Sequence, residues 1–328
     1  MSTLYIIVPC YNEEEVLPET AKRLREKMTA LITNGEISTE SRVVFVDDGS
    51  RDQTWSLIEN LHRADPLFSG IGLSRNRGHQ NALLAGLLSV KDLADCTISL
   101  DADLQDDLDA IDEMVAKYKD GCDVVYGVRS ARDTDTRFKR YTAESYYRFI
   151  RAFGGEVVFN HADYRLLSKR ALEALSEYRE SALFLRGLVP MIGLRSDTVH
   201  YARGERFAGE TKYPLSKMIA LAVDGITSLS VRPLRLITLA GLIVLLKTLI
   251  LTLVFVIQHA LGTPIWGWRI PTLAIFANSG FLLLCLGIVG EYAGKTYMES
   301  KRRPRFLVEK VLHRDPKMTQ NAPETDPK

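Results

Sequence analysis

Two acidic residues near the middle of the chain have the spacing of a cation-binding pair. Asp101 and Asp103 follow the apolar run 96–100, which we predict to be a β-strand. Because alternate residues of a strand point the same way, both carboxylates should converge at its carboxyl end. At about 4 Å and an effective dielectric constant near 20, they would repel each other by about 4 kcal/mol. A hard divalent cation removes that repulsion and commonly binds substrate phosphates, so the pair predicts a metal–diphosphate site.

The acidic segment has a second interpretation, as the cap of a helix that we predict from Leu108 onward. The surrounding elements favour a site. The apolar runs predicted as strands are Leu4–Val8, Val43–Val46, Gly70–Leu73, Thr97–Leu100 and Asp123–Tyr126. Helical periodicity lies between them, over 17–31, Thr54–Leu61, Gln80–Leu88 and Leu108–Tyr118. Such alternation predicts a Rossmann-like α/β domain over residues 1–212, with a mostly parallel sheet covered on both faces.

Two further loops should share the edge of the sheet that carries the acidic pair, because the carboxyl ends of parallel strands lie side by side. The first strand ends in Val8-Pro-Cys-Tyr-Asn-Glu13 and the second in Phe45-Val-Asp-Asp-Gly-Ser50. Tyr11 can stack on a nucleotide base whose N–H Asp48 accepts. Glu13 or Asp47 can bind sugar hydroxyls. No Gly-x-Gly-x-x-Gly follows the first strand and no Walker-type loop is present, which disfavours dinucleotide and P-loop sites.

The first helix has local start and stop signals. Asn12 and Glu15 have the spacing of a capping box before it, and Asn34-Gly35 has the composition of a helix stop after it. These signals predict a helix that begins close to the loop of the first strand.

The last third of the chain is apolar enough to enter a bilayer. Residues 236–257 and 271–293 are runs of roughly 22 residues, each about 33 Å long as a helix, which matches a bilayer core. Basic residues flank their outer ends, whereas the connection 258–270 has Arg269 as its single lysine or arginine. The positive-inside rule then predicts two transmembrane helices, an extracytoplasmic loop at 258–270 and both termini in the cytoplasm. A buried helical hairpin is the alternative.

The segments around these two runs complete the predicted organisation. Residues 213–235 form an amphipathic stripe that suits an interfacial helix, although an ordinary helix docked on the α/β domain fits the same pattern. Residues 294–328 form a basic cytoplasmic tail whose polar end should be disordered. Lys247 lies near the middle of the first run, where it could face a helix partner, another subunit or an anionic headgroup, or extend toward the interface.

Bulk composition excludes several classes of partner. The 328 residues include 42 lysines plus arginines and 41 aspartates plus glutamates, so no basic surplus indicates nucleic acid. The four cysteines lack metal-type spacing, which favours free thiols in a reducing compartment. The first apolar run is too short for a signal peptide, so we expect the α/β domain in the cytoplasm, anchored to the cytoplasmic membrane.

The motifs together resemble a known family. The segments Val8-Pro-Cys-Tyr-Asn-Glu13, Val46-Asp-Asp-Gly-Ser50 and Asp101-Ala-Asp-Leu-Gln105 resemble the family 2 glycosyltransferases of the GT-A fold. A further set resembles the polyprenyl-phosphate glycosyltransferases, the group of bactoprenol glucosyltransferases and dolichyl-phosphate mannose synthases. This set is Tyr126-Gly-Val-Arg-Ser130, Ala162-Asp-Tyr-Arg-Leu-Leu167, 203–214 and Asp224-Gly-Ile-Thr-Ser228, with the two C-terminal spans. The resemblance runs from about Thr3 to Val311.

The resemblance implies roles for individual residues. It implies that Asp101, Asp103 and Gln105 bind Mg²⁺ or Mn²⁺, and that Asp163 matches the proposed catalytic base, with Asp103 the second catalytic residue. The residues expected to bind the nucleotide sugar are Pro9, Tyr11, Glu13, Asp47, Asp48 and Asp101. Those expected at the acceptor phosphate are Arg129, Arg140, Arg206 and Lys212, although the last two fit anionic lipid headgroups equally well.

Several of these residues have a structural alternative. Asp163 could be the N-cap of a following helix. Arg129 and Arg140 could be solvated charges. His79 could approach the diphosphate, although a structural hydrogen bond is the simpler expectation. The chain also departs from the family where two prolines usually follow Leu-Gln-Asp, because Asp107-Leu108 stands there and alters the entry to the next helix.

The activity that the resemblance implies is an inverting, metal-dependent transfer of a hexose to a polyprenyl phosphate such as undecaprenyl phosphate. The donor would be a nucleotide sugar such as UDP-glucose or UDP-N-acetylglucosamine. A phosphomonoester is largely dianionic at neutral pH, so Asp163 should orient substrate more than remove a proton. A homo-oligomer, for example a tetramer, is expected by resemblance. The alternatives are a processive polysaccharide synthase, whose Gln-x-x-Arg-Trp motif is missing here, and a non-catalytic nucleotide-sugar-binding membrane scaffold.

Overall fold

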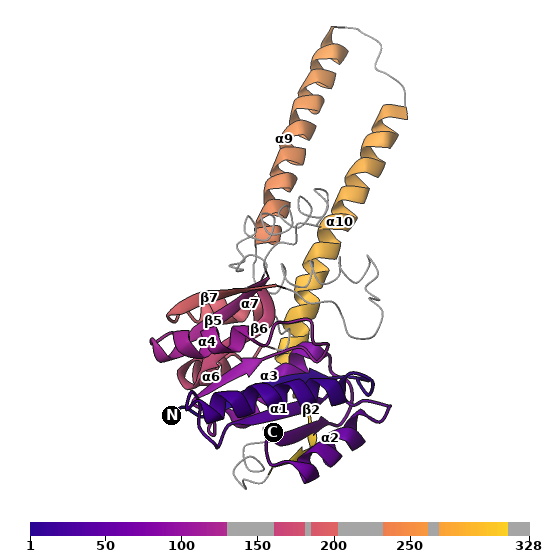
Figure 1. Cartoon of the computed structure of the whole chain (residues 1–328). Coiled ribbons are helices and arrows are strands. Elements are labelled where there is room, and N and C mark those ends of the chain that lie inside the picture. Colours follow the sequence, from indigo (N-terminus) through magenta and orange to yellow (C-terminus); the bar gives the residue numbers. More distant parts are fainter. Residues whose placement is uncertain (130–160, 181–184, 203–231, 262–268, 314–328) are drawn as a thin grey trace. The chain divides into compact units, whose positions relative to one another are not determined.

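The computed structural model of the chain describes residues 1–129, 161–180, 185–202, 232–261 and 269–313. These residues belong to two compact units, one an α/β unit and the other a pair of long helices (Figure 1). The predicted phosphate-binding residues Arg140, Arg206 and Lys212 lie outside the described residues, as do 213–231 of the predicted interfacial segment.

An eight-stranded sheet forms the centre of the α/β unit, with the order β7-β5-β6-β4-β1-β2-β3-β8. The strands are β1 (Leu4–Cys10), β2 (Arg42–Asp47), β3 (Phe68–Leu73), β4 (Cys96–Ser99), β5 (Val124–Arg129), β6 (His161–Ser168), β7 (Ser196–Tyr201) and β8 (Val308–Leu312). Strands β4, β1, β2 and β3 are mutually parallel, and β5 is parallel to β7. Among the described strands, only β6 and β8 run antiparallel to their neighbours. The mostly parallel Rossmann-like sheet predicted from the sequence is confirmed.

Helices cover both faces of this sheet (Figure 1). They are α1 (Leu17–Thr33), α2 (Thr54–Ala64), α3 (His79–Val90), α4 (Ala110–Lys119), α6 (Lys169–Ser176) and α7 (Leu185–Met191). Along β1, Leu4, Ile6 and Val8 pack with α1, α2 and α4, whereas Tyr5 and Ile7 pack with α3 and α6. The strands are therefore buried on both sides, as continuous apolar runs require in parallel sheets.

The ends of α1 test the predicted local signals. The helix begins at Leu17 with Val16 as an N-cap that makes no side-chain bond, so the predicted capping box of Asn12 and Glu15 is wrong. The Asn12 side chain instead accepts the backbone N–H of Arg51 at 2.9 Å and joins the loops after β1 and β2. The predicted stop is confirmed, because Gly35 follows the helix with φ of 71°.

The second unit consists of α9 (Arg232–Ala260) and α10 (Arg269–Ser300), which pack against each other. Both helices extend beyond the predicted spans 236–257 and 271–293. By length and composition, one stretch of the described residues, Ala274–Ser300, is sufficient to cross a membrane. The first span, the membrane topology and the location of the termini therefore stay predictions. Lys247 lies on α9 with an exposed side chain, and its role also stays open.

Candidate active site

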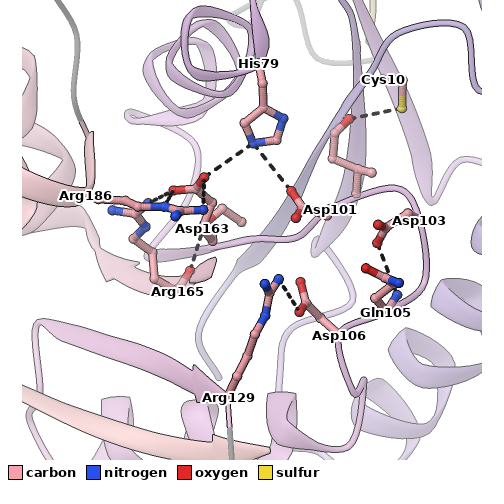
Figure 2. A network of polar contacts seen from close by, with 12 residues as sticks. Cys10, His79, Asp101, Asp103, Gln105, Asp106, Arg129, Asp163, Arg165 and Arg186 are labelled. Carbon is pink, nitrogen blue, oxygen red and sulfur yellow. Dashed lines mark hydrogen bonds and ion pairs between the residues drawn. The ribbon is translucent and has the colours of Figure 1, made fainter. Parts of the chain in front are cut away.

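The acidic loop after β4 brings Asp101 and Asp103 to the edge of the sheet. Because β4 ends at Ser99, neither residue lies in the strand, and the side-chain alternation from which we predicted their convergence does not apply. Asp101 points toward α3, whereas Asp103 accepts the backbone N–H of Gln105 at 3.2 Å (Figure 2). The alternative of a helix cap is wrong for both residues, since α4 has Asp109 as its N-cap.

This loop concentrates negative charge. Burial, with smaller contributions from the carboxylates of Asp106, Asp163 and Asp103, raises the pKa of Asp101 to about 6 against the opposing effect of His79. A hard divalent cation would relieve that repulsion, and carboxylate and amide oxygens are ligands that Mg²⁺ and Mn²⁺ accept. Among the described residues, no three His, Cys, Asp or Glu side chains are gathered as a metal site. The residues present fit a cation that completes its shell with substrate or water oxygens.

Asp163 lies on β6 and is held by two arginines (Figure 2). Arg165, two residues further along the strand, forms an ion pair with its Oδ1 atom. Arg186, on α7, places Nε 3.2 Å from Oδ1 and Nη2 3.1 Å from Oδ2. Burial alone would raise the pKa of Asp163, but the two guanidinium groups outweigh it and hold the pKa well below its ordinary value. The N-cap alternative is wrong, because Ser168 caps α6.

His79 connects the acidic loop with Asp163. It is the first residue of α3, and its Nε2 atom lies 3.4 Å from Oδ1 of Asp101 and 3.7 Å from Oδ2 of Asp163 (Figure 2). Asp48 holds the backbone that precedes α3, because its carboxylate accepts the N–H groups of Arg77 and Gly78 at 2.7 and 2.8 Å. The structural hydrogen bond expected for His79 stays a prediction, and the ring lies within 3.7 Å of both carboxylates.

Arg129 ends β5 and faces the same cluster (Figure 2). Its Nη2 atom lies 3.2 Å from Oδ1 of Asp106, and its Nε donates to the hydroxyl of Tyr201 at 3.2 Å. Burial would lower the pKa of Arg129, but Asp106 and Tyr201 outweigh that effect and raise it. Only 23% of the Arg129 side chain is exposed, so the alternative that Arg129 is a freely solvated charge is wrong.

The residues predicted to bind the nucleotide divide into two groups. Tyr11, 41% exposed, and Asp47 line a cavity of about 340 Å³ beside the loops after β1 and β2. Glu13 lines a neighbouring hollow. Pro9 and Asp48 are buried and outside the lining of both, and Asp48 supports the loop before α3. The edge of the sheet thus brings Tyr11 and Asp47 together, with Asp48 behind them.

Sequence reasoning missed four residues of this site. Arg165 had a signal, since Asp163 and Arg165 point the same way once 161–168 is recognised as a strand. Asp106 had one too, as the next acidic residue of the motif itself. Arg186 and Tyr201 come from α7 and β7, and nothing in their local sequence indicates that these elements reach the site.

The sequence matches a family model and is similar to known proteins over most of its length. The sequence model described as "Glycosyl transferase family 2" matches residues 5–176. The chain is 47% identical over 312 residues to the uncharacterized glycosyltransferase YkoT of Bacillus subtilis, covering 95% of this chain and 93% of that one. It is 36% identical over 308 residues to a prophage bactoprenol glucosyl transferase homolog of Escherichia coli, covering 93% and 98%.

Among solved structures, mannosyl-3-phosphoglycerate synthase of Rubrobacter xylanophilus aligns with a TM-score of 0.48 and 15% identity over 71% of this chain and 74% of that chain. This similarity is too low to support an inference about ligands, so the family assignment depends on sequence. The family match over residues 5–176 and the near full-length relatives show that the chain is a glycosyltransferase and belongs to family 2, with its GT-A fold.

Proposed function

We propose that this glycosyltransferase moves a hexose from a nucleotide sugar to a polyprenyl phosphate at the membrane surface. The observation that carries the proposal is the contact of an anionic loop with arginine-held Asp163 through His79. Such a site offers carboxylates for a cation-bound diphosphate and guanidinium groups for a second phosphate. Two relatives support the acceptor, because a prophage bactoprenol glucosyl transferase homolog of Escherichia coli and a bactoprenol glucosyl transferase of Shigella phage SfV match more than nine tenths of this chain.

The donor half of the proposed site contains the acidic loop and the loops after β1 and β2. Asp101, Asp103 and Gln105 would hold Mg²⁺ or Mn²⁺, which when bound would neutralise negative charge on the leaving diphosphate. Tyr11 and Asp47 line the cavity beside the loops after β1 and β2 and would bind the nucleoside. His79 is positioned beside Asp101, where its ring N–H can donate to a phosphate oxygen.

The acceptor half contains the arginines. Arg129 is oriented by Asp106 and Tyr201, and Arg186 keeps part of its side chain exposed while it holds Asp163. Guanidinium groups suit a phosphomonoester, whose second pKa near 6 leaves it largely dianionic at neutral pH. Its oxygen needs no base to attack the anomeric carbon from the face opposite the diphosphate, which would invert that carbon. Asp163 would then orient the sugar or the acceptor.

A transfer assay tests the proposal. Purified full-length protein would be mixed with labelled UDP-glucose or UDP-N-acetylglucosamine, undecaprenyl phosphate and Mg²⁺ or Mn²⁺, and the label extracted into organic solvent. We expect one labelled lipid product with one of the donors, formed at least about 100-fold more slowly by Asp103→Asn. Label in a polymer would instead support the polysaccharide synthase. Nucleotide binding without product, for any common donor, would support the non-catalytic scaffold and contradict the proposed transfer to lipid.

A further inference from the structure

The cavity beside Tyr11 has a wall from the far end of the chain. Its volume of about 340 Å³ lies near the lower end of ligand pockets, about 300–1,000 Å³. Most of its lining comes from the loops after β1, β2 and β3, which contribute Tyr11, Ser50 and Arg75 among others. Glu309 and Lys310 complete the lining, and both lie on β8, the strand that follows α10 in sequence.

Strand β8 is fixed to the sheet at the cavity. It pairs antiparallel with β3, with Lys310 opposite Gly72, and the backbone N–H of Ser74 donates to the carbonyl of Leu307 at 3.0 Å. A Cβ atom on Gly72 would lie 3.1 Å from the Trp55 ring and 3.3 Å from Cβ of Lys310. The missing side chain at position 72 therefore allows the α2 tryptophan and the β8 lysine to approach each other.

Lys310 presents a positive charge to the cavity between an aromatic ring and a carboxylate. Its Nζ atom lies 5.3 Å from the centre of the Trp55 ring, a cation–π distance. The ring is oriented by a hydrogen bond from Trp55 Nε1 to Glu59 at 2.7 Å. Burial raises the pKa of Asp47, and the charge of Lys310 is near enough to oppose that rise. The lysine thus belongs electrostatically to the same cavity as Asp47.

The chemistry of the lining selects one class of ligand. Two aromatic rings, Tyr11 and Trp55, suit a planar base, and Asp47 suits ribose hydroxyls or a base N–H. The cations Arg75 and Lys310 suit negative charge. A nucleoside phosphate combines all of these groups, whereas a free sugar or a lipid tail does not.

We propose that β8 forms the outer wall of the nucleotide pocket and that Lys310 contributes to the affinity for the nucleotide part of the donor. The inference rests on the proposed function and deepens it, because the sequence analysis described residues 294–328 as a basic cytoplasmic tail and gave them no part in donor binding. By this inference β8, the strand that follows α10, is part of the donor site. Donor binding then requires β8 to be paired with the sheet.

Charge removal on β8 tests this role. Full-length Lys310→Gln keeps an unbranched polar side chain and removes the charge, and Lys22→Gln is a matched control on the exposed face of α1. We expect Lys310→Gln to raise the dissociation constant of UDP by about tenfold in calorimetry, as loss of one charged hydrogen bond would. The donor KM should rise similarly, while kcat, the acceptor KM and the melting temperature stay within about twofold or a degree of wild type. Lys22→Gln should change none of these.

The outcomes separate this inference from the proposed function. Unchanged UDP affinity in Lys310→Gln overturns the inference even if transfer to lipid is observed. Both Glu309→Gln and Lys310→Gln could lose UDP affinity and also show a lower melting temperature. That result would show that β8 acts in folding alone, and it would overturn the inference. Failure of the wild-type protein to bind UDP, GDP or ADP would do the same. Lysine-dependent UDP binding without lipid product would support the inference and contradict the proposed acceptor.

Discussion

Asp163 on β6 and Arg186 on α7 form a two-point ion pair, with both carboxylate oxygens within 3.2 Å of guanidinium nitrogens. Arg165 contacts the same carboxylate from its own strand and is itself fully buried. The two cations hold the pKa of Asp163 well below its ordinary value against the opposing effect of burial. A carboxylate in this state is a weak base, because proton transfer is most efficient when the pKa of the base lies near the working pH.

The first prediction concerns the relative loss of activity in two aspartate variants. Asp163→Asn should lower kcat about 10- to 100-fold, as loss of a positioning group does, and should leave the pH profile of kcat unchanged between pH 6 and 9. Asp103→Asn should lower kcat at least tenfold further, because it removes part of the diphosphate site. Initial rates with saturating donor and acceptor check this order.

Asp92→Asn is the control for these kinetic measurements, because Asp92 is exposed after α3. Loss of an acidic limb in the profile of Asp163→Asn, together with a deeper loss of kcat than in Asp103→Asn, would instead assign the base role to Asp163.

The second prediction follows from the sign of the same pKa shift. A depressed pKa means that the ionised Asp163 stabilises the fold above its unfolded pKa of about 4, and that this contribution is lost as the pH falls through the lower folded value. Removing one partner of a buried pair costs about 3–5 kcal/mol. Asp163→Asn should therefore lower the unfolding free energy by about that amount between pH 6 and 8, and by progressively less below pH 4. Denaturant unfolding at several pH values measures this difference, and a difference independent of pH down to acid unfolding would contradict it.

The local sequence was sufficient to predict the half of the site that lies at the carboxyl ends of the parallel strands. Tyr11, Asp47 and Asp101 were predicted on one edge because each follows an apolar run, and parallel strands align their carboxyl ends. The helices from α1 to α4 were predicted from 3.6-residue periodicity, which is a local property. Their caps were less predictable, because Asn12 hydrogen-bonds across to the next loop in place of the helix that follows it.

The other half of the site depends on pairings that no local pattern specifies. Strand β6 inserts antiparallel between β4 and β5, so it aligns Asp163 with the acidic loop although Asp163 comes 62 positions after Asp101 in the sequence. Tyr201 reaches Asp106 because β7 pairs with β5, and Lys310 reaches the cavity because β8 pairs with β3. Each of these contacts requires the order of strands in the sheet, which periodicity leaves undetermined.

The third prediction concerns how Arg129 is oriented. Asp106 is buried, and its Oδ1 accepts from Arg129 at 3.2 Å and from the Tyr201 hydroxyl at 2.5 Å. Tyr201→Phe should loosen Arg129 and raise the acceptor KM about three- to tenfold, with the donor KM unchanged and a stability loss of about 1–2 kcal/mol. Acceptor titration at fixed donor measures the effect.

Tyr118→Phe is the matched control for this hydroxyl removal, because the Tyr118 hydroxyl donates to the carbonyl of Asp95 outside the cluster. Equal rises of the acceptor KM in both tyrosine variants, or a rise of the donor KM in Tyr201→Phe, would show that the hydroxyl of Tyr201 does not act through Arg129.

The fourth prediction tests the cation site by a readout that is independent of turnover. Burial raises the pKa of Asp101, and neighbouring carboxylates add a repulsion that should be relieved when a divalent cation binds. Ligand binding to the folded state raises stability by mass action. At a cation concentration of 100 times the dissociation constant, the gain is about 2.7 kcal/mol, which is several degrees in melting temperature. Mn²⁺ or Mg²⁺ should therefore raise the melting temperature of the wild-type protein after EDTA treatment, and UDP should increase the shift by adding phosphate ligands.

Asp101→Asn should abolish the shift because the loop then lacks one of its two carboxylate ligands, whereas Asp92→Asn should retain it. A shift that survives in Asp101→Asn would place the cation elsewhere and remove the acidic loop from the proposed donor site.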